Sequence, residues 1–173
     1  MVERELQFIS EPGDRCDELW QRLVDAEWAF YTARARLFSS CRNKLVELTR
    51  EALKVPQQQV TALGIVKLLM VEERQELLPE VLQLACTVHG QTETASDLVL
   101  GLPRQWLLDN IEPAAEPLLR FDDYEEYRGL FQIYLELDLR LAKTLAERAA
   151  KHPDVDIQEA ADDFFRVLKE NDG

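Results

Sequence analysis

The sequence predicts an all-α fold, and three observations support this prediction. Six glycines in 173 residues are few for a β-rich domain, and no Asn-Gly or Asp-Gly pair lies between alternating apolar residues. Good helix formers (Leu, Ala, Glu, Gln and Arg) dominate the composition. Apolar residues recur at helical spacing along most of the chain. We therefore expect antiparallel helical hairpins, stacked as a short α-α superhelix or as an irregular helical bundle.

The first third of the chain predicts a long helix followed by a shorter one. Residues 1–13 form an N-terminal extension, and Asp14 is the expected N-cap of the first helix. Its apolar residues lie at helical spacing, and Trp20 and Trp28 are expected in the core or lining a groove. A bend at Ser39 and Ser40 is expected before a second apolar stretch, which Pro56 ends because a proline disfavours the helical conformation of the residue before it.

The middle of the chain predicts two further helices and a loop. The helices are expected over 57–70 and 73–88. Pro79 requires either a first-turn position or a bend in the second of them, and Gly90 is its natural C-terminal cap. Residues 91–96 are polar and predict a loop, and residues 97–100 predict a short helical piece or turn.

The last third predicts a proline-limited helix and then three capped helices. Pro103 suits the first position of a helix that contains Trp106, another expected core or groove residue. The prolines at positions 113 and 117 predict a break near Asn110 or a sharp kink. The expected N-caps of the three following helices are Asp123, Asp138 and Asp156. We expect a single all-α domain over 14–173, with a sub-boundary near 90–102 as the alternative.

Residues 152–164 read HPDVDIQEAADDF, an Asp-rich turn followed by an apolar, a polar and then small residues. This segment resembles the entry to the second helix of a HEAT-type repeat, an armadillo-like α-helical repeat. Gln158 stands where the family usually has Arg. At roughly 40 residues per repeat, the resemblance implies about four helical pairs, each contacting its neighbours.

The net charge excludes some classes of partner and favours others. Asp and Glu total 33 against 20 Lys and Arg, giving −13 at pH 7. A chain of this charge disfavours binding to nucleic acid or to an anionic membrane surface, both of which select clustered cations. Residues 1–10 lack the apolar stretch of a signal peptide. Three cysteines with no Cys-x-x-Cys pair fit a reducing cytoplasm, so we expect a cytoplasmic protein.

The sequence carries no motif of a known catalytic or cofactor site. Phosphate-binding glycine loops, a Gly-x-Ser-x-Gly motif and a His-Glu-x-x-His motif are all absent. Its histidines are His89 and His152, and neither follows an acidic residue by three positions as a di-iron bundle requires. We therefore predict no catalytic residue, no metal site, no cofactor and no enzymatic activity.

The distribution of charge along the chain indicates an acidic C-terminal half. Residues 1–86 hold 14 acidic and 11 basic side chains, whereas residues 87–173 hold 19 acidic and nine basic ones. Within the second half, one aromatic and acidic segment has the composition of a binding surface, since Tyr and Arg are enriched at interface hot spots. The predicted partner-binding residues are Asp122, Asp123, Glu125, Glu126, Tyr127 and Arg128. The tyrosines of this segment also fit a core stripe.

These observations favour a non-enzymatic helical module for protein–protein interaction. An adaptor, a scaffold and an inhibitor or immunity-type protein would all present the acidic C-terminal surface to a partner with a basic surface. Self-association is a further expectation from the basic stretch at 34–54. The alternative is a helical bundle that binds a small ligand or metal in its core.

Overall fold

A computed structural model describes residues 15–87, 90–120 and 123–171 of the chain. These residues form ten α-helices, three short 3-10 helices and no strand, which confirms the all-α prediction. Asp14, His89 and Asp122 lie outside the described residues. The chain divides into two compact units, Met1–Leu45 and Val46–Gly173, and each is described by itself.

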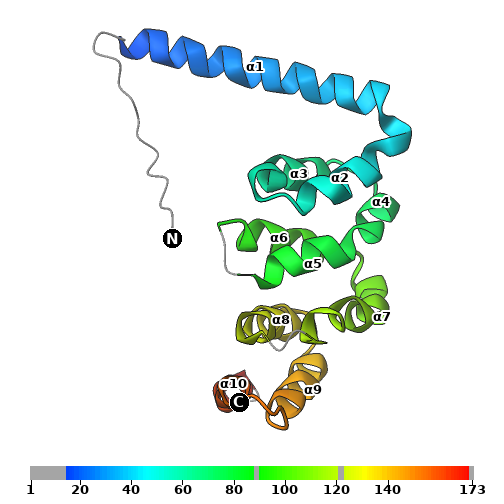
Figure 1. The fold of residues 1–173 in the computed structure, drawn as a ribbon, viewed down its shortest axis with the longest axis vertical. Helices are drawn as coiled ribbons and strands as arrows, with labels where there is room; N and C mark the ends of the chain where they lie inside the picture. The colour runs from blue at the N-terminus through cyan, green and yellow to red at the C-terminus, as the bar shows by residue number, and fades with distance from the viewer. Residues whose placement is uncertain (1–14, 88–89, 121–122, 172–173) are drawn as a thin grey trace. The chain divides into compact units, whose positions relative to one another are not determined.

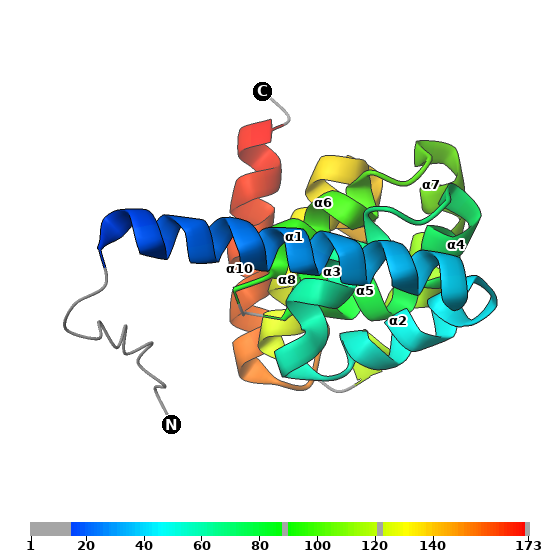
Figure 2. The same ribbon diagram turned by 90° about the horizontal axis from the view of Figure 1, so that it is seen from above.

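The first unit contains α1 (Cys16–Ser40) and a 3-10 helix (Arg42–Lys44). Figure 2 shows α1 as one continuous helix. It ends at the predicted break, where the Cys41 amide donates to the Leu37 carbonyl at 2.9 Å. None of its residues is buried. Trp20 and Trp28 are 67% and 69% exposed, so the expectation that they pack in the core is wrong.

The second unit contains helices that follow one another as pairs in chain order. Figure 1 shows α2 with α3, α5 with α6, α7 with α8, and α9 with α10. The short α4 connects the first two pairs. The bounds of the helices are α2 (Leu45–Leu53), α3 (Gln59–Val66), α4 (Val71–Glu76), α5 (Leu78–Cys86), α6 (Thr92–Leu100), α7 (Arg104–Ala115), α8 (Tyr124–Leu137), α9 (Leu139–Ala149) and α10 (Val155–Asn171).

Side-chain caps fix the starts of the last three helices. The Asp123 carboxylate accepts from the Glu125 amide at 2.8 Å, and the Asp138 carboxylate accepts from the Arg140 amide at 2.8 Å, as predicted. Asp138 follows the last residue of α8 directly, so one residue both ends α8 and caps α9. Asp154 accepts from the Asp156 amide at 2.8 Å, so the prediction of Asp156 as the cap of α10 was wrong.

Two predicted features of the middle helices differ from the structure. Thr92–Leu100 is helical, because buried Ala95, Leu98 and Val99 hold this polar segment on the core. The stretch predicted as one helix over 73–88 is two, α4 and α5. Pro79 lies in the first turn of α5, which was one of its two predicted positions, and there its missing N–H costs no hydrogen bond.

Helix α7 runs through Pro113 to Ala115 without the predicted break near Asn110. Ile111 and Ala115, on either side of the proline, are both fully buried. Their packing offsets the hydrogen bond that the proline removes. The helix instead ends before Pro117.

A close backbone contact between α5 and α8 lies at the centre of the second unit. A Cβ atom added at Gly129 of α8 would lie 2.6 Å from the carbonyl oxygen and 2.8 Å from the carbonyl carbon of Cys86, the last residue of α5. Only glycine leaves room for this approach. Leu82 of α5 and Leu130 of α8 are both fully buried in the core that the two helices share.

An aromatic pair holds α8 against α10. The rings of Phe131 and Phe164 stack with their centroids 4.0 Å apart and their planes 4° from parallel. Both side chains are buried, at 0% and 3% exposure. This pair, with the small residues Ala160 and Ala161 beside it, closes the C-terminal end of the core.

We predict that Gly129→Ala lowers the free energy of unfolding by about 1–3 kcal/mol, because the new methyl group meets backbone atoms that have no rotamer to adopt. Gly64→Ala is the matched control, since Gly64 also lies inside a helix but has no atom within 4 Å of an added Cβ. There the substitution should stabilise by roughly 0.5–1 kcal/mol. Urea denaturation of both variants measures the difference, and equal effects would contradict the close contact.

Phe164→Ala should destabilise the protein by about 3–5 kcal/mol, the cost of an unfilled cavity beneath the Phe131 ring. Val155 lies on the same helix and is 62% exposed, so Val155→Ala should change stability by less than about 0.5 kcal/mol. Thermal denaturation followed by circular dichroism compares the two. An unchanged midpoint for Phe164→Ala would show that this face of α10 is not in the core.

Candidate functional site

The predicted partner-binding segment lies at the start of α8, and only part of it faces solvent. Asp123, Glu125 and Arg128 are exposed. Asp123 is already engaged as the N-cap of the helix. Asp122 lies outside the described residues. The segment therefore presents two carboxylates and one guanidinium to a partner.

Tyr127 and Glu126 are less accessible to a partner than predicted, because Tyr127 is buried and Glu126 is half-buried. Tyr127 is 0% exposed, and its ring packs edge-on against His152 with centroids 5.5 Å apart. Glu126 is half-buried, and its Oε2 atom is buried without a hydrogen-bond partner among the described residues. Burial raises the pKa of this carboxyl, and the nearby Asp123 charge raises it further.

Arg128 links α8 to α10. Its guanidinium lies over the Tyr124 ring, 5.2 Å from the centroid, and its Nη2 atom lies 3.5 Å from Oδ2 of Asp163. Both partners of this ion pair are about half exposed, so the pair contributes little to stability. It does hold the guanidinium at the junction of the two helices, and it partly neutralises the carboxylates around it.

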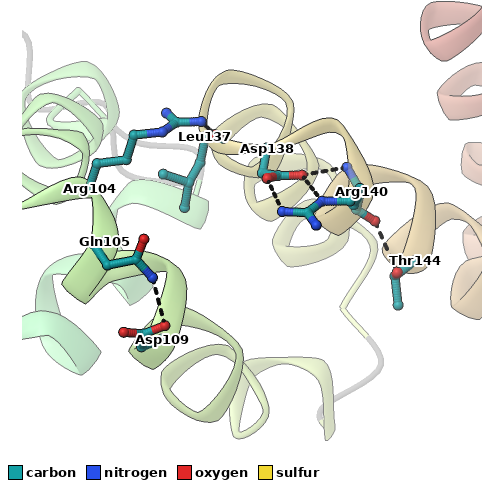
Figure 3. A network of polar contacts seen from close by, with 7 residues as sticks. All are labelled: Arg104, Gln105, Asp109, Leu137, Asp138, Arg140 and Thr144. Carbon is teal, nitrogen blue, oxygen red and sulfur yellow. Dashed lines mark hydrogen bonds and ion pairs between the residues drawn. The ribbon is translucent and has the colours of Figure 1, made fainter.

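A second acidic surface lies between α7 and α9, and the sequence analysis did not find this surface. We call it the acidic groove, and it has a volume of about 400 Å³. Three carboxylates and one guanidinium give its lining a net charge of −2. Its lining residues are Gln105, Leu108, Asp109, Glu112, Asp138, Arg140, Leu141 and Thr144. Figure 3 shows the polar contacts of Gln105, Asp109, Asp138, Arg140 and Thr144 on its two sides.

Two contacts link the walls of the acidic groove at its ends. At the start of α7, the Arg104 guanidinium donates to the carbonyl of Leu137, the last residue of α8, two positions before α9 begins (Figure 3). At the far ends of α7 and α9, Nη1 of Arg148 lies 2.7 Å from Oε2 of Glu116, and this hydrogen bond lowers the pKa of Glu116. The beginning of α7 thus lies near the beginning of α9, and the two helices meet at their ends, so α7 and α9 run parallel along the groove.

Within the groove, Asp138 and Asp109 differ in their freedom to meet a partner. The Asp138 carboxylate accepts hydrogen bonds from the Arg140 side chain, at 2.9 Å, and from the Arg140 backbone amide. These hydrogen bonds lower the pKa of the carboxyl to about 2. Asp109 and Glu112 are exposed, one turn apart on α7, with Gln105 donating to Asp109 at 3.1 Å. A cationic side chain entering the groove would therefore meet these two carboxylates first.

The described residues show few features of a catalytic or metal centre. No three or more His, Cys, Asp or Glu side chains in the described part of the chain are grouped to hold a metal ion. Cys86 is buried, which raises the pKa of its thiol to about 12, and the Glu126 charge contributes to the shift. That thiol is protonated at neutral pH and is a poor nucleophile. Among the same residues, no helix is long and apolar enough to cross a membrane.

We predict that Glu126→Gln stabilises the protein at neutral pH and not in acid. The pKa of Glu126 is higher in the folded protein than its value of 4.5 in the unfolded chain. Its protonated form therefore favours the native state at pH values below 4.5, and this contribution is lost as the pH rises through the pKa of the folded state. The variant should therefore match the wild type below about pH 4 and exceed it at pH 7. The measurement is the free energy of unfolding in urea across this range.

Glu125→Gln is the control, because this neighbouring carboxylate is exposed in the first turn of α8 and interacts favourably with the helix dipole. It should be neutral or slightly destabilising at pH 7. The inward orientation of Glu126 would be contradicted if both variants behaved alike.

Comparisons with protein-family models, with curated proteins and with solved structures give no match for this chain. The resemblance of residues 152–164 to a HEAT-type repeat therefore stays a prediction.

Proposed function

We propose that this protein is a non-enzymatic helical module for protein–protein interaction, whose acidic C-terminal half binds a basic surface of a partner protein. The observation that supports this most directly is the acidic groove between α7 and α9, where exposed Asp109 and Glu112 stand beside Asp138. Lys and Arg side chains of a partner are the natural complement of such a lining.

The groove is suited to recognition because its walls are held by contacts outside the charged part of its lining. The contacts of Arg104 with Leu137 and of Glu116 with Arg148 leave Asp109 and Glu112 at the surface. A partner therefore meets charges already placed, with little reorganisation of the helices. Exposed charges of this kind raise the rate of association more than the final affinity, and their effect weakens with salt.

An adaptor, a scaffold and an inhibitor or immunity-type protein each fit this mode of binding. A cytoplasmic setting is part of the proposal, supported by free thiols at Cys16, Cys41 and Cys86. HEAT-type stacking of the helical pairs is likewise proposed, and the parallel course of α7 and α9, the first helices of successive pairs, supports it.

We predict that the double variant Asp109→Lys, Glu112→Lys loses the partner while keeping the fold. Both residues are exposed, so the melting temperature should change little. Affinity for a basic partner should fall by about tenfold or more at low ionic strength, and the difference should shrink as salt is added. Tagged wild type and variant, incubated with source-cell lysate at low and high salt and compared by quantitative mass spectrometry, provide the first measurement.

The matched control is Glu93→Lys, Asp97→Lys on α6, which makes the same change in net charge at two exposed residues one turn apart. A protein captured by the wild type and by this control, and lost by the groove variant, identifies the partner, which is then titrated in pure form. Equal loss in both double variants would mean that only total charge matters, and the groove would not be the binding surface.

A further inference from the structure

Helix α1 exposes a broad apolar face that no described residue of the first unit covers. Its large apolar side chains are between 41% and 69% exposed, and they lie on one half of the helix. So much exposed apolar surface is costly in water and marks an interaction surface. We call this surface the α1 face, and its residues are Leu19, Trp20, Leu23, Val24, Trp28, Phe30 and Tyr31.

The charges of α1 are divided between its two ends. Residues 16–27 carry four acidic side chains and one basic one, whereas residues 28–40 carry two arginines and no acidic residue. A second helix with the same division fits best when it runs in the opposite direction, because its basic half then lies along the acidic half of the first. A second copy of α1 has this division.

Two charged residues lie within the α1 face itself. Glu27 and Arg34 are separated by seven residues, or about two turns, so they lie on the same side of the helix. The Arg34 guanidinium sits over the face, 5.4 Å from the centroid of the Phe30 ring and 5.7 Å from that of Tyr31. A parallel pair in register would place each charge next to its own copy, which costs energy.

In an antiparallel pair centred between Phe30 and Tyr31, each of the two charges lies next to an opposite charge of the second copy, and apolar residues lie next to apolar residues. In that register, residues of the two apolar faces whose numbers add up to 61 lie at the same level along the pair, so Glu27 meets Arg34 of the second copy. The register places large apolar side chains of the two copies at the same level along the pair. The matched positions are Phe30 with Tyr31, Leu23 with Phe38, and Val24 with Leu37.

The area of the α1 face is in the range that a stable dimer needs. An aromatic side chain offers about 150–250 Å², so the four half-exposed or more exposed rings of the face supply on the order of 400–500 Å² per copy. A standard interface takes about 800 Å² from each partner, and Leu19, Leu23 and Val24 supply much of the remainder.

We infer that α1 is a dimerisation helix, which pairs antiparallel with α1 of a second copy of this chain through the apolar α1 face and reciprocal Glu27–Arg34 contacts. The inference rests on α1 alone and is independent of the acidic groove.

The test is sedimentation velocity of the full chain over a range of concentrations, with the wild type and three variants. The wild type should populate a species of twice the 20.0 kDa chain mass. Glu27→Arg and Arg34→Glu each create two like-charge contacts in an antiparallel dimer, so each should weaken dimerisation by about tenfold or more. The variant that combines them restores both contacts and should dimerise within about threefold of the wild type, since only the positions of the charges are exchanged.

Asp25→Arg and Arg36→Glu are the matched controls. They make the same charge changes on the same helix, at exposed positions on its polar side. Each should weaken dimerisation far less than Glu27→Arg or Arg34→Glu, because its side chain lies outside the contact between the two apolar faces. Asp109→Lys, Glu112→Lys should leave the dimer unchanged, which separates this test from that of the acidic groove.

Three results would overturn the inference. The first is a wild type that stays monomeric at about 100 µM, far above the dissociation constant of a standard interface. This includes a monomer that binds lipid vesicles through α1. The second is a dimer that the single reversals leave intact, as a parallel pair or a different interface would give. The third is a combined variant that stays as weak as either single one.

Discussion

The close approach of the α5 and α8 backbones at Gly129 governs the arrangement of the second unit. Helix α8 contacts α5 and also α9 and α10. The position of α8 against α5 therefore determines where the two C-terminal helices lie. The Phe131–Phe164 stack and the shared residue Asp138 depend on that position. The acidic groove depends on it too, because its α9 wall begins where α8 ends. The absence of a side chain at Gly129 therefore helps to determine where the acidic groove lies, although no glycine lines the groove.

Local features of the fold were predictable, and features set by packing were not. A cap acts over two or three residues, and so the sequence identified Asp123 and Asp138 correctly. The cap of α10 was displaced to Asp154 because two aspartates compete within three positions of one turn. The continuity of α7 through Pro113 could not be predicted, since it depends on the burial of Ile111 and Ala115 by other helices.

The predicted break near Asn110 is also the reason that the sequence analysis did not find the acidic groove. A break near Asn110 would have placed Asp109 and Glu112 on different elements, whereas the continuous helix sets them one turn apart. Composition did indicate that the acidic surface lies in the C-terminal half. It could not tell that Tyr127 faces the core, because tyrosine suits a core and an interface equally. For α1, spacing identified the apolar stripe, but periodicity cannot tell a stripe that meets the core from one that is left exposed.

The direct junction of α8 and α9 at Asp138 also restricts how the length of this chain can vary. No loop separates the two helices, so an inserted or deleted residue there would rotate α9 by about 100° relative to α8. Asp138 would lose its place as a cap, and Leu141 and Thr144 would leave the wall of the groove. Related chains should therefore keep the spacing from Gly129 to Asp138 fixed. Length changes should instead fall in the turn over 150–154, where the chain leaves α9 before α10 begins.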